Sequence, residues 1–189
     1  MKENKKNLLD RIKKLYKKGG HVSTSALVMA LQKVDADNLI IEKDGVYSTD
    51  HTELIYSRGK QDVVMVPKHI TKIGDMAFAR KKKLKHVLLP AGLKEIGEEA
   101  FADCDALTEV TIPESVETIG DYAFFDCDRL RRVVFLGMPK HISRKAFESC
   151  DELHDIAVSD NNVKAMRKAL HLNDGDINYL VVAEDYERR

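Results

Sequence analysis

A 23-residue repeat is the feature that most constrains how this 189-residue chain can fold. Single residue types recur in register along the middle of the sequence, and the clearest columns are Phe78, Phe101, Phe124 and Phe147, then Ile73, Ile96, Ile119 and Ile142. Shorter columns are Pro67, Pro90 and Pro113, then Gly74, Gly97 and Gly120, then Cys104, Cys127 and Cys150. One copy is too small to bury its own apolar face. The copies must therefore stack into a solenoid with a continuous core.

The third copy shows what one repeat is expected to form. The segment Val110–Ile112 alternates apolar and polar residues, which predicts a short strand, and Pro113 ends it. Ile119 and Gly120 predict a second short extended piece followed by a turn. The segment 121–127 places its apolar residues at helical spacing, so we expect one or two helical turns there.

The pattern IP-x-x-V-x-x-IG-x-x-AF-x-x-C-x-x-L-x-x-V, from Ile112 to Val133, closely resembles the BspA-type leucine-rich repeat. The resemblance covers about residues 62–158. It implies an α/β repeat solenoid, a right-handed stack of coils, with protein binding or adhesion as its function. It carries no catalytic residues. The last copy departs from the pattern at Leu136 and Ser143, as an end copy does.

The chain divides into four expected parts. Residues 1–37 form an N-terminal helical cap, 38–61 a hairpin-like segment that leads into the repeats, 62–158 the repeats, and 159–189 a C-terminal cap and tail. Amphipathic patterns predict helices over 7–18, 24–34 and 159–172, and INYLVV predicts a strand over 177–182. Asp44-Gly45 is a good turn dipeptide in the hairpin-like segment, which is similar to one that often precedes such repeats. For the N-terminal helices, a helix-turn-helix fragment and a peripheral membrane helix are the alternatives.

Composition excludes several classes of protein. Lys plus Arg equal Asp plus Glu, 31 each, so the whole chain is not a polycation. The charge is uneven, however: residues 1–86 carry 19 basic and 10 acidic residues, and residues 87–189 carry 12 and 21. Head-to-tail self-association is therefore one expected possibility, and the oligomeric state stays open. No apolar run reaches the ~18–20 residues of a membrane span. The basic N-terminus lacks the features of a signal peptide, which favours a cytoplasmic location. Surface exposure by another export route stays open.

No catalytic constellation emerges from the sequence. It has no P-loop, no GxGxxG, GxSxG, HExxH or CxxC motif, and no histidine pair at metal-ligand spacing. We therefore expect no enzyme activity, no metal site and no cofactor. We expect the three cysteines to lie one above another in adjacent coils, and we interpret them as small buried hydrophobic residues rather than as disulfides or redox groups.

The strand face is the expected protein-binding surface. Side chains alternate along each strand, so two columns should point outward. These are His86, Glu109, Arg132 and Asp155, and Leu88, Thr111, Val134 and Ala157. They predict a narrow groove with an apolar stripe from Leu88 to Val134, flanked by charges of alternating sign. The alternative is that these charges only stabilise the sheet.

The first regular copy is strongly basic. The cluster consists of Lys68, Lys72, Arg80, Lys81, Lys82, Lys83 and Lys85. We expect it to be either a solvated edge or a contact for an acidic partner. A nucleic-acid-associated regulator, using the basic N-terminal helices and Arg80 to Lys83, is an alternative function. No aromatic residues are interleaved with the cluster for base stacking. We favour a protein partner.

Overall fold

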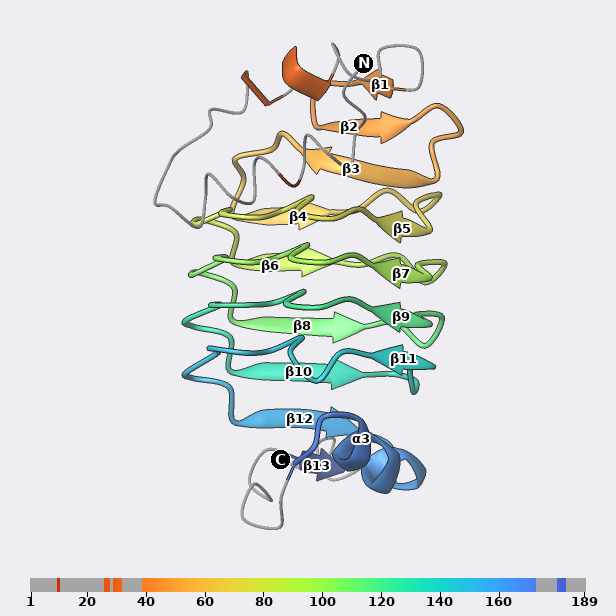
Figure 1. Cartoon of the computed structure of the whole chain (residues 1–189), viewed down its shortest axis with the longest axis vertical. Coiled ribbons are helices and arrows are strands. Elements are labelled where there is room, and N and C mark those ends of the chain that lie inside the picture. Colours follow the sequence, from red (N-terminus) through yellow and green to blue (C-terminus); the bar gives the residue numbers. More distant parts are fainter. Residues whose placement is uncertain (1–9, 11–25, 28, 32–38, 173–179, 183–189) are drawn as a thin grey trace.

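The computed structural model describes residues 10, 26, 27, 29–31, 39–172 and 180–182. It is a tall stack of coils, and each coil contributes a strand to each of two sheets (Figure 1). The described part of one sheet runs, in spatial order, β13 (Leu180–Val182), β12 (Asp155–Val158), β10 (Arg132–Phe135), β8 (Glu109–Ile112), β6 (His86–Leu88) and β4 (Val63–Met65). We call it the long-strand sheet, and all of its strand pairs are parallel.

The second sheet begins with three antiparallel strands and continues with one short strand from each coil. Its order is β1 (Leu39–Ile41), β2 (Gly45–Ser48), β3 (Glu53–Ser57), β5 (Lys72–Ile73), β7 (Glu95–Ile96), β9 (Thr118–Ile119) and β11 (His141–Ile142). The register joins residues 23 positions apart, such as Ile96 with Ile119. The repeat columns of the sequence are therefore ladders in space, which confirms the solenoid.

The third side of each coil differs from the expectation. Residues 121–127 form consecutive turns rather than helical turns. Their amides bond between coils: the Phe101 amide donates to the Ala123 carbonyl at 2.7 Å, and the Phe124 amide donates to the Ala146 carbonyl at 2.8 Å. Left-handed backbone at Tyr122 and Asp126, with φ of 56° and 55°, turns the chain to make these bonds. The prediction of helical turns from the spacing of apolar residues was wrong, because backbone hydrogen bonds between coils replace the hydrogen bonds within a helix.

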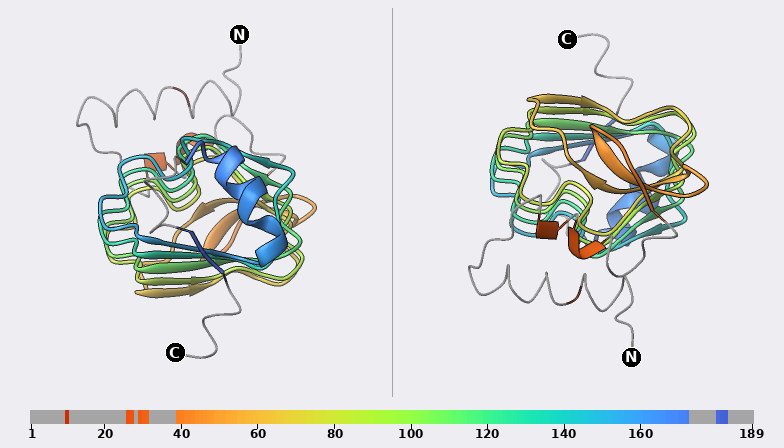
Figure 2. Two further views of the ribbon diagram at one scale, coloured as in Figure 1. Left: turned by 90° about the horizontal axis from the view of Figure 1, so that it is seen from below. Right: turned by 90° about the horizontal axis from the view of Figure 1, so that it is seen from above.

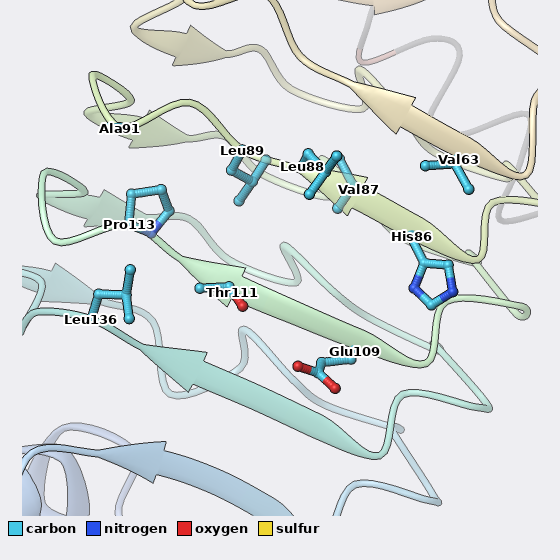
Figure 3. Close-up of a pocket in the computed structure, with 10 residues that line it drawn as sticks. All are labelled: Val63, His86, Val87, Leu88, Leu89, Ala91, Glu109, Thr111, Pro113 and Leu136. Carbon is cyan, nitrogen blue, oxygen red and sulfur yellow. The ribbon is translucent and has the colours of Figure 1, made fainter. Parts of the chain in front are cut away.

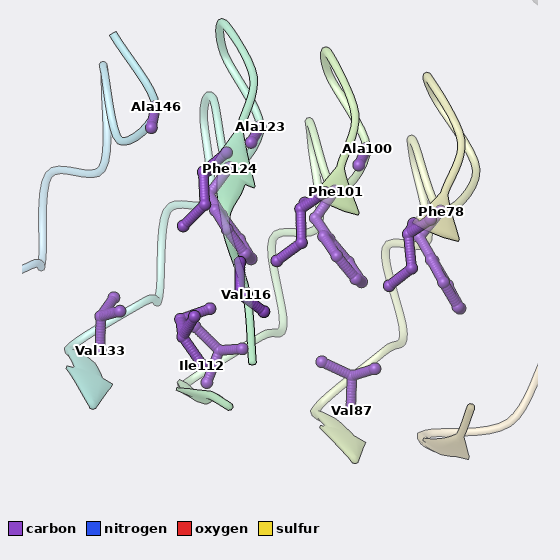
Figure 4. Packing of buried hydrophobic residues seen from close by; sticks show 14 of the residues in the cluster. Phe78, Val87, Ala100, Phe101, Ile112, Val116, Ala123, Phe124, Val133 and Ala146 are labelled. Carbon is purple, nitrogen blue, oxygen red and sulfur yellow. The ribbon is translucent and has the colours of Figure 1, made fainter. Parts of the chain in front are cut away.

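The core is built from the ladders inside the coils. The rings of Phe78, Phe101, Phe124 and Phe147 stack nearly parallel, with successive centroids 4.8, 5.0 and 5.3 Å apart. Figure 4 shows the first three of these rings. The first three of these side chains are fully buried. Stacked rings at this spacing add to the free energy gained by burial alone.

Both ends of the stack are covered, but only partly as expected. Residues 26, 27 and 29–31 are helical (Figure 2). Leu27 and Leu31 are buried in a cluster that includes Val46 and Ile55. The rest of the expected helix 24–34, and the helix 7–18 apart from Asp10, lie outside the described residues. At the other end, η2 (Asp160–Asn162) leads into α3 (Val163–Ala169), which is shorter than the predicted helix over 159–172. α3 buries Met166.

The hairpin-like segment is a three-stranded antiparallel unit, and its first turn differs from the expected one. The Glu42 amide donates to the Gly45 carbonyl at 2.9 Å, so the turn lies ahead of Gly45, which is the first residue of β2. Within the residues that the structure describes, no helix has the length and apolarity required to traverse a bilayer. The cytoplasmic location stays a prediction.

Candidate protein-binding surface

A groove of about 550 Å³ opens on the outer face of the long-strand sheet, over β4, β6 and β8 (Figure 3). Its polar lining comes from His86, Glu109 and Thr111. Its apolar lining includes Val63, Leu88 and Leu136. The groove exists because parallel strands of this solenoid present alternate side chains to solvent, and here several of those side chains are aliphatic.

The apolar residues of this face are unusually exposed for their type. Val63 and Leu88 are each 52% exposed, Leu136 is 61% exposed and Met65, beside the groove on β4, is 71% exposed. Met29 is the fifth large apolar residue of high exposure among the described residues. Four of the five therefore gather on one face, and an exposed apolar cluster of this kind marks interaction surfaces.

Four predicted face residues lie where the alternation placed them. His86, Leu88, Glu109 and Thr111 are exposed, and His86 faces Glu109 across neighbouring strands. The prediction missed Val63 and Met65, which occupy the same two columns one repeat earlier. The period itself could have identified them. It also missed Leu136, which replaces the expected proline of its column and so exposes an aliphatic side chain.

The prediction for the other end of the groove, at Arg132 and Val134, is wrong. Arg132 is buried, with 9% of its surface exposed, and its Nε lies 3.3 Å from an oxygen of Asp155 on the next strand. Val134 is half-buried, and Ala157 is buried. Arg132 is therefore part of an internal ion pair rather than of an exposed charged column. The accessible apolar stripe runs from Val63 and Met65 through Leu88, not from Leu88 to Val134.

The basic cluster is largely neutralised by carboxylates of neighbouring coils. Four ion pairs join it to residues 23 positions away: Lys72–Glu95 at 2.9 Å, Arg80–Asp103 at 3.3 Å, Lys82–Asp105 at 2.6 Å and Lys85–Asp62 at 2.8 Å. Exposed pairs of this kind add little to stability. They do compete with any external anion for the same cations.

Lys81 is not part of an exposed patch. It occupies the cysteine position of its copy, and its Nζ donates to the Gly59 carbonyl at 2.8 Å and lies 5.2 Å from the centre of the Tyr56 ring. Burial lowers the pKa of Lys81. Within the described residues, Lys81, Lys68 and Lys83 are the members of the cluster that form no ion pair, and of these Lys68 and Lys83 are exposed.

The cysteine ladder has a structural role in the described residues. Each thiol donates to the carbonyl of the phenylalanine 26 positions earlier: Cys104 to Phe78 at 3.2 Å, Cys127 to Phe101 at 3.2 Å and Cys150 to Phe124 at 3.0 Å. All three cysteines are free. Across the described part of the chain, no group of three or more His, Cys, Asp or Glu side chains could hold a metal ion.

The three thiols should differ in reactivity. Burial raises the pKa of Cys104 to about 12. The interaction of the Cys127 and Cys150 side chains raises the pKa of Cys127 and lowers that of Cys150. Cys150 also lines a cavity of about 300 Å³ beside α3. At pH 8 we expect a thiol reagent to label Cys150 at least about tenfold faster than the other two, because reactivity follows thiolate population and access.

Intact-mass measurements over a labelling time course would test this order. The variant Cys150→Ser is the control and should lose the fast phase only. Labelling of Cys104 at the rate of Cys150 would contradict the buried ladder.

Comparison with known proteins agrees with this architecture. The family described as BspA type leucine-rich repeat region matches residues 54–174, in six copies. The chain belongs to this family. BspA-type proteins are commonly interaction modules, and their solenoid is typically non-enzymatic. A search of curated proteins found no match.

Three solved structures illustrate the likeness. The pneumococcal vaccine antigen PcpA is 26% identical, with 67% of this chain and 32% of PcpA covered and a TM-score of 0.61. A leucine-rich repeat protein of Eubacterium ventriosum is 23% identical, covering 65% and 34%, with a TM-score of 0.58. One from Bacteroides capillosus is 21% identical, covering 63% and 96%, with a TM-score of 0.57. This chain thus spans about a third of the length of the first two proteins, and the likeness to the last two shows the fold alone.

Proposed function

We propose that this BspA-type chain is a non-enzymatic protein-interaction module that binds a protein partner in the groove of the long-strand sheet. The observation that carries the proposal is the cluster of Val63, Met65, Leu88 and Leu136, each more than half exposed on one face. Burying these aliphatic side chains against a partner would supply the main favourable free energy of binding. His86 and Glu109 beside them would set the orientation of the partner.

The partner should place an apolar side chain in the groove and polar groups beside His86 and Glu109. Large aromatic residues, which often dominate interfaces, do not line the groove. The expected affinity through the groove alone is therefore moderate. The ion pairs of the basic cluster favour a protein over a nucleic acid, because Lys72, Arg80, Lys82 and Lys85 already have carboxylate partners.

Replacing Leu88 by glutamate is expected to weaken partner binding about tenfold or more, because the charge must be desolvated within the apolar contact. The unfolding midpoint should stay near that of the parent, since Leu88 is exposed. The measurement is a pull-down from the lysate of the source cell, with quantification of each captured protein by mass spectrometry.

The matched control is Met29→Glu, which places the same charge at another exposed apolar residue away from the groove. A partner retained by the parent and by Met29→Glu but lost by Leu88→Glu supports the groove. Capture that is indifferent to Leu88→Glu, or capture of nucleic acid that disappears at moderate salt, overturns it.

A further inference from the structure

Among the described residues, the long-strand sheet ends at a strand that has a neighbouring strand on one side only. β4 is its terminal strand and pairs on one side only, with β6. The amides of Lys85 and His86 donate to the Asp62 carbonyl at 2.6 and 3.1 Å, and the Val66 amide donates to the Leu88 carbonyl at 3.0 Å. Because bonding alternates along a strand, the backbone groups of Val63 and Met65 point away from β6.

Those outward backbone groups have no partner among the described residues. Among the described residues, the amides and carbonyls of Val63 and Met65 form no hydrogen bond. Viewed along the stack, β4 lies on the side of the coils away from the helical residues 26–31 (Figure 2). Folded proteins usually protect such an edge with charged side chains, proline, or a covering segment. Here the edge instead carries two strongly exposed aliphatic residues.

Unpaired positive charges flank this edge. Lys60 precedes β4, Lys68 follows it, and Lys83 lies at the start of the neighbouring coil. All three are exposed, and none forms an ion pair within the described residues. Asp62, which directly precedes β4, is already bound by Lys85 at 2.8 Å, and Lys83 adds only a weaker attraction to it. An occupant of the edge would therefore gain from acidic residues at both of its ends.

We infer that β4 is a strand-addition site for an extended protein segment that has a short apolar or β-branched centre and acidic ends. The segment hydrogen-bonds through its backbone to Val63 and Met65 and thereby extends the long-strand sheet by one strand. Its outward side chains meet the aliphatic groups of Val63 and Met65, and its acidic ends meet Lys60, Lys68 and Lys83. The inference rests on the proposed function and specifies the form of the partner.

The test uses the full chain, labelled with ¹⁵N, and the synthetic peptide EETVTVTEE as the probe. Titration is expected to shift the backbone amide signals of Val63 and Met65. The variant Met65→Pro should weaken the Kd about tenfold or more, because it removes an outward donor and blocks close approach of the added strand. Proline is tolerated on an edge strand where its missing amide faces solvent, so this variant should fold. Met65→Thr, which keeps the amide, is the matched control.

Modified peptides keep the inference testable even if Met65→Pro fails to fold. Two N-methylated peptides would be compared, one methylated on the backbone amides of its Val residues and the other on those of its Thr residues. Because only alternate amides of the added strand face β4, one of the two peptides should lose binding and the other should keep it. The charge-reversed peptide KKTVTVTKK should bind at least about tenfold more weakly.

Other results would overturn the inference. One is an absence of amide shifts at about 1 mM peptide, and another is an equal effect of the two methylation patterns on binding. A third is the finding that the β4 edge is already occupied by self-association of the chain. Binding that is lost in Leu88→Glu but unchanged in Met65→Pro would overturn strand addition while leaving the groove supported. Binding with the opposite sensitivity would support strand addition while removing support for the groove.

Discussion

Replacing Phe124 by alanine is expected to lower the free energy of unfolding by about 3–5 kcal/mol. The Phe124 side chain is fully buried, and its ring stacks on Phe101 at 5.0 Å and on Phe147 at 5.3 Å. Alanine would leave a cavity between two coils whose backbones are joined by hydrogen bonds and cannot simply close together. Urea denaturation followed by circular dichroism would measure the loss.

The neighbouring residue provides a matched control. Phe125 is half-buried and contacts Tyr122 edge-on, with ring centres 5.5 Å apart. Phe125→Ala should therefore cost clearly less than Phe124→Ala, although the same atoms are removed. Equal losses at the two positions would show that the phenylalanine ladder is not the main core of the stack.

Replacing Gly120 by alanine is expected to cost about 1–3 kcal/mol, through overpacking rather than through a cavity. A β-carbon at this position would lie 2.8 Å from the backbone nitrogen of Glu98 and 2.9 Å from the backbone carbon of Gly97. Both atoms belong to the preceding coil, so relief requires the two coils to move apart. The shift in the urea midpoint would report the cost.

Gly92→Ala is the matched control, because a β-carbon at Gly92 would not clash with a neighbouring coil. The nearest heavy atom to a β-carbon there is the Lys68 carbonyl oxygen, at 3.9 Å. Gly92→Ala should be neutral or stabilise the chain by up to about 1 kcal/mol, because it restricts the unfolded state. A similar loss at both glycines would contradict the close approach of coils at the glycine column.

The parts of the fold that follow the period could be predicted from the sequence. The Ile, Phe and Cys columns became ladders because each coil repeats the register of the one before it. The segment 121–127 could not be read correctly from its own residues. Its apolar spacing suits a helix, and only the presence of a neighbouring coil shows that the amide of Phe124 bonds to Ala146 instead.

The candidate surface shows the same division. The outward direction of Leu88 and Thr111 was predicted correctly because strand alternation alone determines it. The burial of Arg132 was not predicted, because alternation gives only the direction of a side chain. The ion pair of Arg132 with Asp155, one repeat later in the same column, instead fits the alternative that these charges stabilise the sheet. The basic cluster was overestimated for a related reason. Its charges were counted within one coil, whereas the carboxylates that pair with Lys72 and Lys82 come from the next.

The identical register of successive coils has a consequence for how such a protein can change over evolutionary time. Duplicating or deleting one whole 23-residue unit within the stack would recreate the same ladders at the new junction. A phenylalanine ring would again stack on a phenylalanine ring, and a cysteine thiol would again donate to a backbone carbonyl. The core would need no redesign, while the outer face would lengthen or shorten by one strand spacing of ~4.8 Å. The length of this outer face can therefore vary independently of the residues that keep the chain folded.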